Sequence, residues 1–537
     1  MKQIVNFFIC IVGCLLLTNC AKTGRPDGGP KDENAPIFVT ANPPYETLNF
    51  SKKEIKLYFD EFVKTKDLNK QLVVSPPLKN PLLITPQGTA SKFLTIEILD
   101  SLKPNSTYIF NLGNAIQDNN EGNTLEGFKY VFSTGNYIDS LTTSGAISDA
   151  FKNTNPKRTN LGLYRIDSTY TDSIVYKEKP NYVATALDTT FFKFTNLRKG
   201  KYFLIALEES NINYIFNPKT DKIGFYSDTL YLPKDSILIK DTKLFKEIQP
   251  YKFKRAKEVT KGKIEFGYEG KIKDLKVNLL SKVPDSFRSV AKLDLEKDTL
   301  NYWHTPIQAD SLNFTVANAN FLDTVTVFLR KKKIDSLKLS TNINGVLHFR
   351  DTFFIKGNNP INLIDSTKIV ITNKDTLNVS FKNFVSQKEN KIGFLFDIKQ
   401  KEKYNIKILP GTFKDIFNTE NDTLNYNIRT KELEDYGRIT LDIVNIKNKN
   451  LIIDLLSGNE KDQIIERVYV KNSKQLVFDL LEPKKYYFRA IVDKNNNKIW
   501  DTGNFLKKQQ PEEVIYFKQE LEVRANNFLE GNVFTIK

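Results

Sequence analysis

The chain has 537 residues and a formal net charge of +16, from 79 lysines and arginines against 63 aspartates and glutamates. Its 40% of hydrophobic residues excludes wholesale disorder, and its length predicts about four or five domains. Three cysteines and two histidines exclude a disulfide-dense scaffold and a multi-zinc array, and they leave little room for histidine-based catalysis.

The first 19 residues have the pattern of an export signal. Lys2 is the only charge, and residues 4–17 form an apolar stretch too short for a relaxed membrane span of about 20 residues. Leu17-Thr18-Asn19-Cys20 resembles a lipobox, the site at which a bacterial lipoprotein precursor is acylated and cleaved. The resemblance implies a lipoprotein signal peptide over residues 1–19 and lipidation of Cys20. The alternative is an ordinary signal peptide or membrane anchor in which Cys20 is incidental.

Residues 20–35 are rich in Gly, Pro and charge, and they predict a flexible tether. The pattern from Cys20 to Pro36 resembles a group of surface lipoproteins of Bacteroidota. The acidic residues Asp27, Asp32 and Glu33 resemble the signal that sends such proteins to the cell surface. The location implied is the outer membrane, with a lipid anchor and the folded part facing the cell exterior.

The rest of the chain predicts an all-β fold of tandem β-sandwiches. Short runs with alternating apolar residues, such as residues 55–59, 93–98 and 324–329, are separated by clusters of Asn, Asp, Gly, Pro and Lys. Alternation puts one side of each strand in a core and leaves the other side in water.

Two segments resemble immunoglobulin-like (Ig-like) domains. Residues 36–136 contain Asn42-Pro43-Pro44 and end in the run Phe128-Lys-Tyr-Val-Phe-Ser-Thr-Gly, and they resemble the bacterial Ig-like domain found in S-layer and other envelope proteins. Residues 336–435 echo the same order of strands, including a final strand that ends in threonine.

An internal repeat links residues 194–217 to residues 478–501 at a constant offset of 284 without a gap. Each copy resembles a transthyretin-like (carboxypeptidase-regulatory-like) β-sandwich, which implies such domains over residues 137–245 and 436–537. Residues 246–335 form a sandwich of unnamed type. Lys484 stands where the first copy has Gly200, which predicts a different backbone geometry or added strain in the second copy.

The second copy contains a candidate calcium loop. Alternating oxygen donors suit a calcium ion, with a backbone carbonyl at the seventh position of the loop. The donors are Asp493, Asn495, Asn497, the carbonyl of Ile499, and Asp501. The loop lacks the glycine and the final glutamate of an EF-hand, and the alternative is an Asn-rich turn without metal. The equivalent loop, with Glu209, Asn211, Asn213 and Asn217, is a weaker candidate. Calcium is the one cofactor that the sequence suggests.

Two further patterns are open to two interpretations. Repeated Asp-Ser/Thr tripeptides resemble an O-glycosylation sequon, but a turn entering a strand produces the same tripeptide. Residues 243–276 and Arg330–Lys333 are basic and suit anionic lipids or an acidic partner, or else form a solvated face. An exported chain makes nucleic acid an unsuitable partner.

No catalytic motif is present in the sequence, such as GxSxG, HExxH or a P-loop. We therefore expect a non-enzymatic, lipid-anchored scaffold or binding protein with no catalytic residue. Its expected partners are outer-membrane β-barrels or other envelope proteins, as for an accessory subunit of the β-barrel assembly machinery. One alternative is a glycan- or surface-adhesion module stabilised by calcium, and another is a hydrolase with an unrecognised carboxylate site.

Overall fold

The computed structural model describes residues 31–238, 241–386, 389–458 and 463–536. These residues are almost entirely β-structure, which confirms the predicted all-β fold. The export signal, Cys20 and most of the tether lie outside the described residues. Within the described ranges, no helix has the length and apolar character needed to cross a bilayer.

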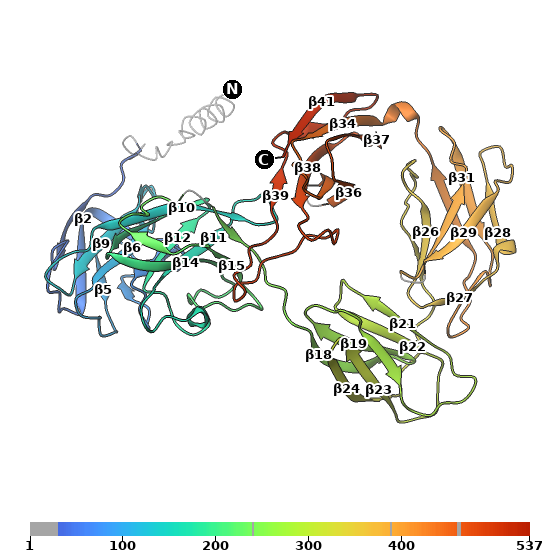
Figure 1. Ribbon diagram of the computed structural model, residues 1–537, viewed down its shortest axis with the longest axis horizontal. Coiled ribbons are helices and arrows are strands. Elements are labelled where there is room, and N and C mark those ends of the chain that lie inside the picture. Colours follow the sequence, from blue (N-terminus) through green and yellow to red (C-terminus); the bar gives the residue numbers. More distant parts are fainter. Residues whose placement is uncertain (1–30, 239–240, 387–388, 459–462, 537) are drawn as a thin grey trace, which may run out of the picture.

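The sheets form five successive units, and the chain curves back so that the fifth unit meets the second (Figure 1). Unit 1 packs a sheet in the order β4-β5-β2-β7-β8, with β1 beside β2, against the sheet β3-β6-β9. Its elements are β1 (Phe38–Asn42), β2 (Glu54–Thr65), α2 (Leu68–Gln71), β3 (Val73–Ser75), β4 (Leu83–Thr85), β5 (Ser91–Glu97), β6 (Thr107–Gly113), β7 (Ile116–Asp118), β8 (Thr124–Leu125) and β9 (Phe128–Ser133).

Unit 2 has the sheets β13-β10-β17 and β12-β11-β14-β15, with β16 beside β14. Its elements are β10 (Leu141–Asp149), β11 (Arg158–Arg165), η1 (Asp172–Tyr176), β12 (Tyr182–Leu187), β13 (Phe191–Leu197), β14 (Gly200–Glu208), β15 (Lys222–Phe225), β16 (Leu230–Leu232) and β17 (Thr242–Leu244).

Unit 3 has the sheets β18-β19-β22-β21 and β20-β23-β24. Its strands are β18 (Lys252–Thr260), β19 (Lys263–Glu269), β20 (Lys276–Leu279), β21 (Ser289–Asp294), β22 (Thr299–His304), β23 (Ser311–Asn318) and β24 (Phe321–Phe328). Alternation follows the prediction in β19, where Ile264, Phe266 and Tyr268 are buried and the residues between them are partly exposed.

Unit 4 has the sheets β25-β26-β30-β29, β28-β31-β33 and β27-β32. Its elements are β25 (Leu339–Thr341), β26 (Phe353–Gly357), β27 (Ile361–Ile364), η2 (Ser366–Lys368), β28 (Ile369–Thr372), β29 (Phe381–Ser386), β30 (Lys391–Phe396), β31 (Lys403–Ile408), β32 (Phe413–Asp415), β33 (Leu424–Arg429) and η3 (Leu433–Asp435).

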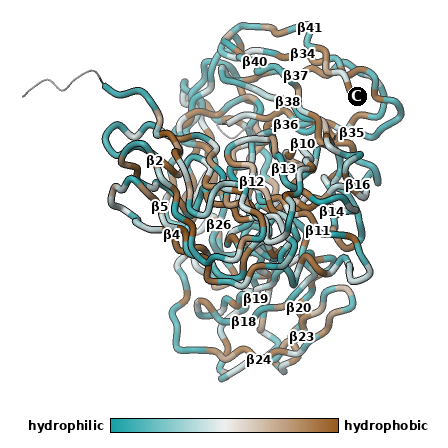
Figure 2. The backbone as a smooth tube through the Cα atoms, turned by 90° about the vertical axis from the view of Figure 1, so that its left-hand side faces the viewer, coloured by the Kyte–Doolittle hydropathy of each residue, from teal (hydrophilic) through white to brown (hydrophobic). Residues whose placement is uncertain are grey.

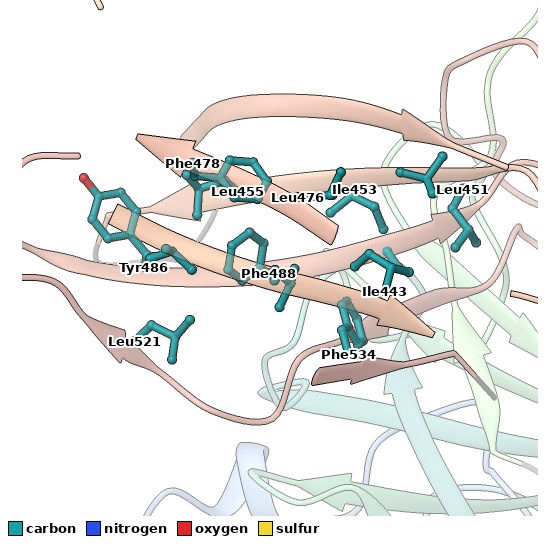
Figure 3. Close-up of a cluster of buried hydrophobic side chains, with 14 of the residues drawn as sticks. Ile443, Leu451, Ile453, Leu455, Leu476, Phe478, Tyr486, Phe488, Leu521 and Phe534 are labelled. Carbon is teal, nitrogen blue, oxygen red and sulfur yellow. The ribbon is translucent and has the colours of Figure 1, made fainter. Parts of the chain in front are cut away.

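Unit 5 has the sheets β37-β34-β41 and β36-β35-β38-β39, with β40 beside β38. Its strands are β34 (Gly437–Val444), β35 (Leu451–Ser457), β36 (Gln463–Val470), β37 (Lys474–Leu481), β38 (Lys485–Val492), β39 (Val514–Tyr516), β40 (Leu521–Glu522) and β41 (Phe528–Thr535). Figure 3 shows the aromatic rings of Phe478 and Phe488 in its core.

Units 1 and 4 close the same corner with the same hydrogen bonds. In unit 1, the backbone N–H of Lys103 donates to Tyr108 Oη at 2.9 Å, and Thr134 Oγ1 donates to the Lys103 carbonyl at 2.7 Å. In unit 4, the N–H of Lys399 donates to Tyr404 Oη at 2.8 Å, and Thr430 Oγ1 donates to the Lys399 carbonyl at 2.6 Å. The threonine that directly follows the last strand in both units therefore has a defined structural role.

Units 2 and 5 share one topology, as the internal repeat requires. In each, the central strand of the smaller sheet has one antiparallel neighbour and one parallel neighbour, which is β17 for β10 and β41 for β34. The tyrosine of each repeat fixes the same turn, because Tyr202 Oη donates to the Arg198 carbonyl at 2.8 Å and Tyr486 Oη to the Glu482 carbonyl at 3.0 Å.

The expected difference between Gly200 and Lys484 is wrong. Neither residue has a positive φ, so lysine adopts this backbone conformation without left-handed strain. The left-handed residues are instead Asn196 and Leu480, with φ of 55° and 54°, at matching irregularities in strand pairing. Leucine tolerates this conformation less well than asparagine, so the strain of the second copy lies at Leu480.

The prediction that each strand has one solvent-exposed face is wrong for the larger sheets of units 2 and 5. Every residue of β35 is buried, and β11 and β14 are buried over most of their length. One face of each sheet lines its own core. In unit 2, the other face is covered by a second hydrophobic cluster that includes Phe505 of unit 5. Near-continuous apolar runs such as residues 202–207 are the sequence sign of this double burial.

Candidate functional site

The two repeat copies carry geometrically equivalent loops, one after β14 and one after β38. In the first loop, Glu209 Oε1 accepts from the backbone N–H groups of Asn213 at 2.9 Å and Tyr214 at 2.7 Å. In the second, Asp493 accepts from the N–H groups of Asn497 at 3.0 Å and Lys498 at 2.9 Å. A carboxylate at one repeat position therefore shapes both loops through backbone hydrogen bonds.

The candidate calcium ligands come together in the second loop. Asp501 Oδ2 accepts from the side-chain amides of Asn495 at 2.6 Å and Asn497 at 2.7 Å, and the N–H of Ile499 donates to Asn497 Oδ1 at 2.9 Å. Asp493 is almost fully buried. The hydrogen bonds are those of the alternative interpretation, an Asn-rich turn. Among the described residues, no group of three or more His, Cys, Asp or Glu side chains is arranged to hold a metal. Calcium binding stays a prediction.

A second carboxylate closes each loop. In the first loop, Asp221 accepts from the N–H of Ser210 at 3.0 Å and of Asn217 at 2.9 Å. In the second, Glu512 accepts from the N–H of Lys494 at 2.7 Å and of Asp501 at 3.0 Å. Burial raises the pKa of Glu512, and these two N–H groups oppose the increase.

The second loop is longer than the first by an insertion that the repeat does not predict. Asp221 follows Asn217 by four residues, whereas Glu512 follows the equivalent Asp501 by 11. The extra residues lie within 502–511 and leave unit 5 to contact unit 2. We call residues 502–511 the clasp.

Phe505 of the clasp is an integral part of the second hydrophobic cluster of unit 2. Its side chain is 0% exposed, and its ring centroid lies 5.6 Å from that of Phe225 and 5.9 Å from that of Phe203. Lys508 Nζ lies 4.3 Å from the Phe203 ring centroid and 2.6 Å from Asp172 Oδ1. Burial of a phenylalanine this complete contributes about 2–3 kcal/mol.

Polar contacts align the clasp on unit 2. The N–H of Phe505 donates to Glu247 Oε1 at 2.6 Å, and Thr502 Oγ1 donates to the Lys246 carbonyl at 2.8 Å. Gln510 Nε2 donates to the Phe225 carbonyl at 3.0 Å. Burial raises the pKa of Glu247, and the Phe505 N–H opposes this increase.

A second group of contacts between units 2 and 5 lies outside the clasp. Tyr516 Oη on β39 donates to the Phe151 carbonyl at 2.6 Å, and the Arg489 guanidinium lies 4.2 Å from the Phe151 ring centroid. Arg489 is itself held by Asp454 at 2.8 Å, inside unit 5. The two repeat copies therefore contact each other through buried apolar, cation–π and hydrogen-bonded groups.

A cavity of about 650 Å³ lies beside this contact, between β10 and β15 of unit 2 and residues 510–516 of unit 5. Tyr226 and Tyr516 contribute aromatic surface, and Asp228, Asp241 and Glu513 contribute carboxylates. Its volume is in the range of small-ligand sites, which favour boundaries between domains.

One histidine packs inside unit 3, and the other lies at the boundary between units 4 and 5. His304 is buried in unit 3, where Nδ1 lies 2.9 Å from the Thr305 carbonyl, and burial lowers its pKa. His348 lies at the boundary of units 4 and 5, with Nε2 2.9 Å from Glu482 Oε1 and Nδ1 3.0 Å from Tyr436 Oη. The structure does not bring the two histidines together.

The internal repeat predicts the loop but not the clasp. The signal was available, because the alignment of the two copies without gaps stops at Asp501. The residues that follow contain an apolar pair, Phe505 and Leu506, in an otherwise polar loop, and this pair is the sequence sign of the contact.

Comparison with known proteins supports the Ig-like assignment of the first unit. Residues 32–134 match the family model described as bacterial Ig-like domain. No curated protein matches the chain.

Solved structures with similarity to the chain include domains 1–6 of the surface layer protein SbsC, at 11% identity and a TM-score of 0.15, covering 91% of this chain and 67% of that one. Salmonella alpha-2-macroglobulin reacted with methylamine is similar at 10% identity and a TM-score of 0.15, over 90% of this chain and 42% of that chain. Extracellular domains 3–5 of Drosophila OTK are similar at 11% identity and a TM-score of 0.15, over 55% and 93%. Scores this low carry no functional information.

Proposed function

We propose that this chain is a non-catalytic scaffold or adhesion protein of the cell surface, in which five β-units hold binding surfaces at fixed separations. The observation that carries the proposal is the buried clasp contact between units 2 and 5. Through it, units 2 to 5 form a closed loop instead of a flexible string. The bacterial Ig-like match over residues 32–134 supports an extracellular, structural role.

Contacts at the other boundaries support a rigid arrangement. At the boundary of units 1 and 2, Thr107 Oγ1 donates to Asp139 Oδ2 at 3.1 Å and the Val183 N–H donates to Ser75 Oγ at 3.1 Å. Lys292 Nζ donates to Asn390 Oδ1 at 2.9 Å between units 3 and 4. A preorganised array binds a partner without first losing the entropy of interdomain motion.

The finer proposal places the scaffold in the outer membrane, anchored by lipid on Cys20 and facing outward. Its support is the N-terminal sequence alone. Removal of the thiol by Cys20→Ala is expected to release the protein from the membrane fraction. Retention of C20A in that fraction at the parent level would contradict the lipid anchor.

The partner class is tested by purification from native membranes in mild detergent. We expect an outer-membrane β-barrel or another envelope protein to co-purify in a fixed ratio, as for an accessory subunit of the β-barrel assembly machinery. The variant Phe505→Ala should reduce this recovery, whereas Leu506→Ala, which alters an exposed neighbour, should not. Recovery of the chain alone would contradict the subunit role.

Carbohydrate binding is the second candidate, and the cavity beside the clasp favours it. Aromatic rings pack on the apolar faces of sugars, and carboxylates accept hydrogen bonds from sugar hydroxyls. Glycan-array binding that is lost in Tyr226→Ala and kept in Phe62→Ala, a change at an exposed residue of unit 1, would support this function.

A further inference from the structure

Strand β24 of unit 3 is a long edge strand that has no bulge and no lysine, and its one charged residue is Asp323. It pairs only with β23, and its eight residue pairs run from Ser311↔Phe328 to Asn318↔Phe321 without a register shift. The edge strand of the facing sheet, β18, differs: its pairing with β19 shifts twice, and it carries lysines. Bulges and lysines are the usual means by which proteins block edge pairing, so β18 is protected in both ways, whereas β24 has only the exposed carboxylate of Asp323.

The alternation of hydrogen-bonded and non-hydrogen-bonded pairs along the hairpin shows which backbone groups of β24 do not bond to β23. Two residues, Ala319 and Asn320, join the strands, so the pair Asn318↔Phe321 is hydrogen-bonded and every second pair after it is too. The N–H of Leu329 donates to the Asp310 carbonyl at 2.8 Å, as this alternation of hydrogen-bonded pairs requires. The N–H and C=O groups of the alternate residues point to the open edge. These are Leu322, Thr326 and Phe328, whereas at Thr324 only the C=O is free, because its N–H donates to Asp323 Oδ1 at 2.8 Å.

The residues at this edge also expose apolar side chains. Leu322 is 72% exposed and Phe328 is 70% exposed. Among the hydrophobic clusters of the described residues, that of unit 3 is the smallest, and Phe253, Phe321 and Val325 are only partly buried against it. An added strand at β24 would cover part of this surface.

A basic groove of about 340 Å³ runs between β24 and β18. Its cationic residues are Arg255, Lys257, Arg330 and Lys332, against the single acid Glu258. Glu258 is already used by its own unit, because it accepts from the N–H of Arg330 at 2.8 Å and of Gly262 at 3.2 Å. Within the described residues, Arg255 and the Arg330 guanidinium form no ion pair. Lys331 and Lys333 flank Lys332 in sequence.

We propose that β24 and this groove dock an extended acidic segment of another protein, which pairs with β24 as an added strand. The free N–H and C=O groups supply the pairing, and the cationic side chains select acidic residues of the segment. The inference rests on the proposed scaffold function and identifies where that scaffold binds and the chemistry of the partner.

The test uses the full chain and a fluorescein-labelled peptide of alternating valine and glutamate, followed by fluorescence anisotropy. Thr326→Pro removes an N–H that points to the open edge and leaves the backbone bonds to β23 in place. Thr326→Ala is the matched control: it keeps the N–H and, like the proline variant, loses the bond from Thr326 Oγ1 to Asn313 Oδ1 at 2.8 Å. We expect T326A to bind as the parent does, and T326P to bind at least about tenfold more weakly.

Arg330→Glu reverses one charge of the basic groove. The residue is exposed and follows β24, so no residue of the sheet is changed. It should weaken binding of the valine–glutamate peptide and allow binding of a valine–lysine peptide.

Equal binding by T326P and T326A, with both folded by circular dichroism, would overturn the strand pairing. Binding of phosphatidylglycerol vesicles in preference to the peptide would overturn the choice of partner. If T326P still co-purifies with an envelope partner, the docking site is wrong and the scaffold function stands.

Discussion

The backbone N–H of Phe505 donates to Glu247 Oε1 at 2.6 Å, although the two residues are 258 positions apart. This bond joins the clasp of the second repeat copy to the chain that leaves the first copy. Units 3 and 4 lie between these residues in sequence, so the contact closes a loop of four units (Figure 1). In the side view of Figure 2, the strands of unit 5 lie at the top and those of unit 3 at the bottom. The closing group is a carboxylate buried at the edge of a hydrophobic cluster, which makes the contact sensitive both to packing and to pH.

Replacement of Phe505 by alanine should open the clasp. The ring is fully buried among Phe203 and Phe225, and truncation of a buried phenylalanine costs about 3 kcal/mol or more. Amide exchange in η1 and β15 should accelerate by about 100-fold, and small-angle X-ray scattering should show a larger radius. Leu506→Ala, at a residue that is 57% exposed, is the control. An unchanged scattering profile for F505A would contradict the closed arrangement.

The clasp contact should weaken as pH rises through the titration of Glu247. Burial raises the folded pKa above the unfolded value of about 4.3, so the folded contact binds the proton more tightly. Its stability is therefore greatest below the unfolded pKa and decreases as pH rises to the folded pKa. Glu247→Gln keeps an oxygen for the Phe505 N–H and removes the buried charge. We expect E247Q to unfold at a higher temperature than the parent at pH 7, with this pH dependence absent. A pH dependence unchanged in E247Q would assign it to another group.

The two repeat copies offer a reciprocal test of backbone strain. Leu480 has a φ of 54° where the first copy has Asn196 at 55°. Asparagine adopts the left-handed region at lower cost, so Leu480→Asn should stabilise unit 5 by up to about 1 kcal/mol. Asn196→Leu should destabilise unit 2, since it adds this strain and removes the bond from Asn196 Nδ2 to the Asp139 carbonyl at 3.0 Å. Thermal unfolding of the two variants should shift in opposite directions, and a shift in the same direction would refute the explanation.

The calcium hypothesis predicts heat on titration of the chain with calcium. Asp501→Asn removes one carboxylate while keeping a side chain of the same shape, so it should abolish the heat without unfolding the loop. Asp493→Ala should abolish it too, but it also removes the acceptor for two backbone N–H groups. Absence of heat in the parent would leave the Asn-rich turn as the complete description of the loop.

The sequence by itself determined the all-β class, because short alternating runs separated by turn residues can bury only one face of a strand each. It also determined that units 2 and 5 are copies of one repeat, because the backbone hydrogen bonds that equivalent residues such as Glu209 and Asp493 accept need those residue types at that spacing. The Ig-like nature of the first unit was predictable from its own motifs for the same reason. All of these depend on contacts within one unit.

Only the tertiary structure decided where the clasp binds, that β35 is buried on both faces, and that Leu480, rather than Lys484, carries the backbone strain. The physical reason is that these features depend on groups far apart in the chain or on the exact pairing of strands. Phe505 looks like any apolar residue in a loop until unit 2 provides a buried site for it. Likewise, the eight residues of β24 have the alternation of an ordinary strand, and only the sheet order shows that one of its edges is free.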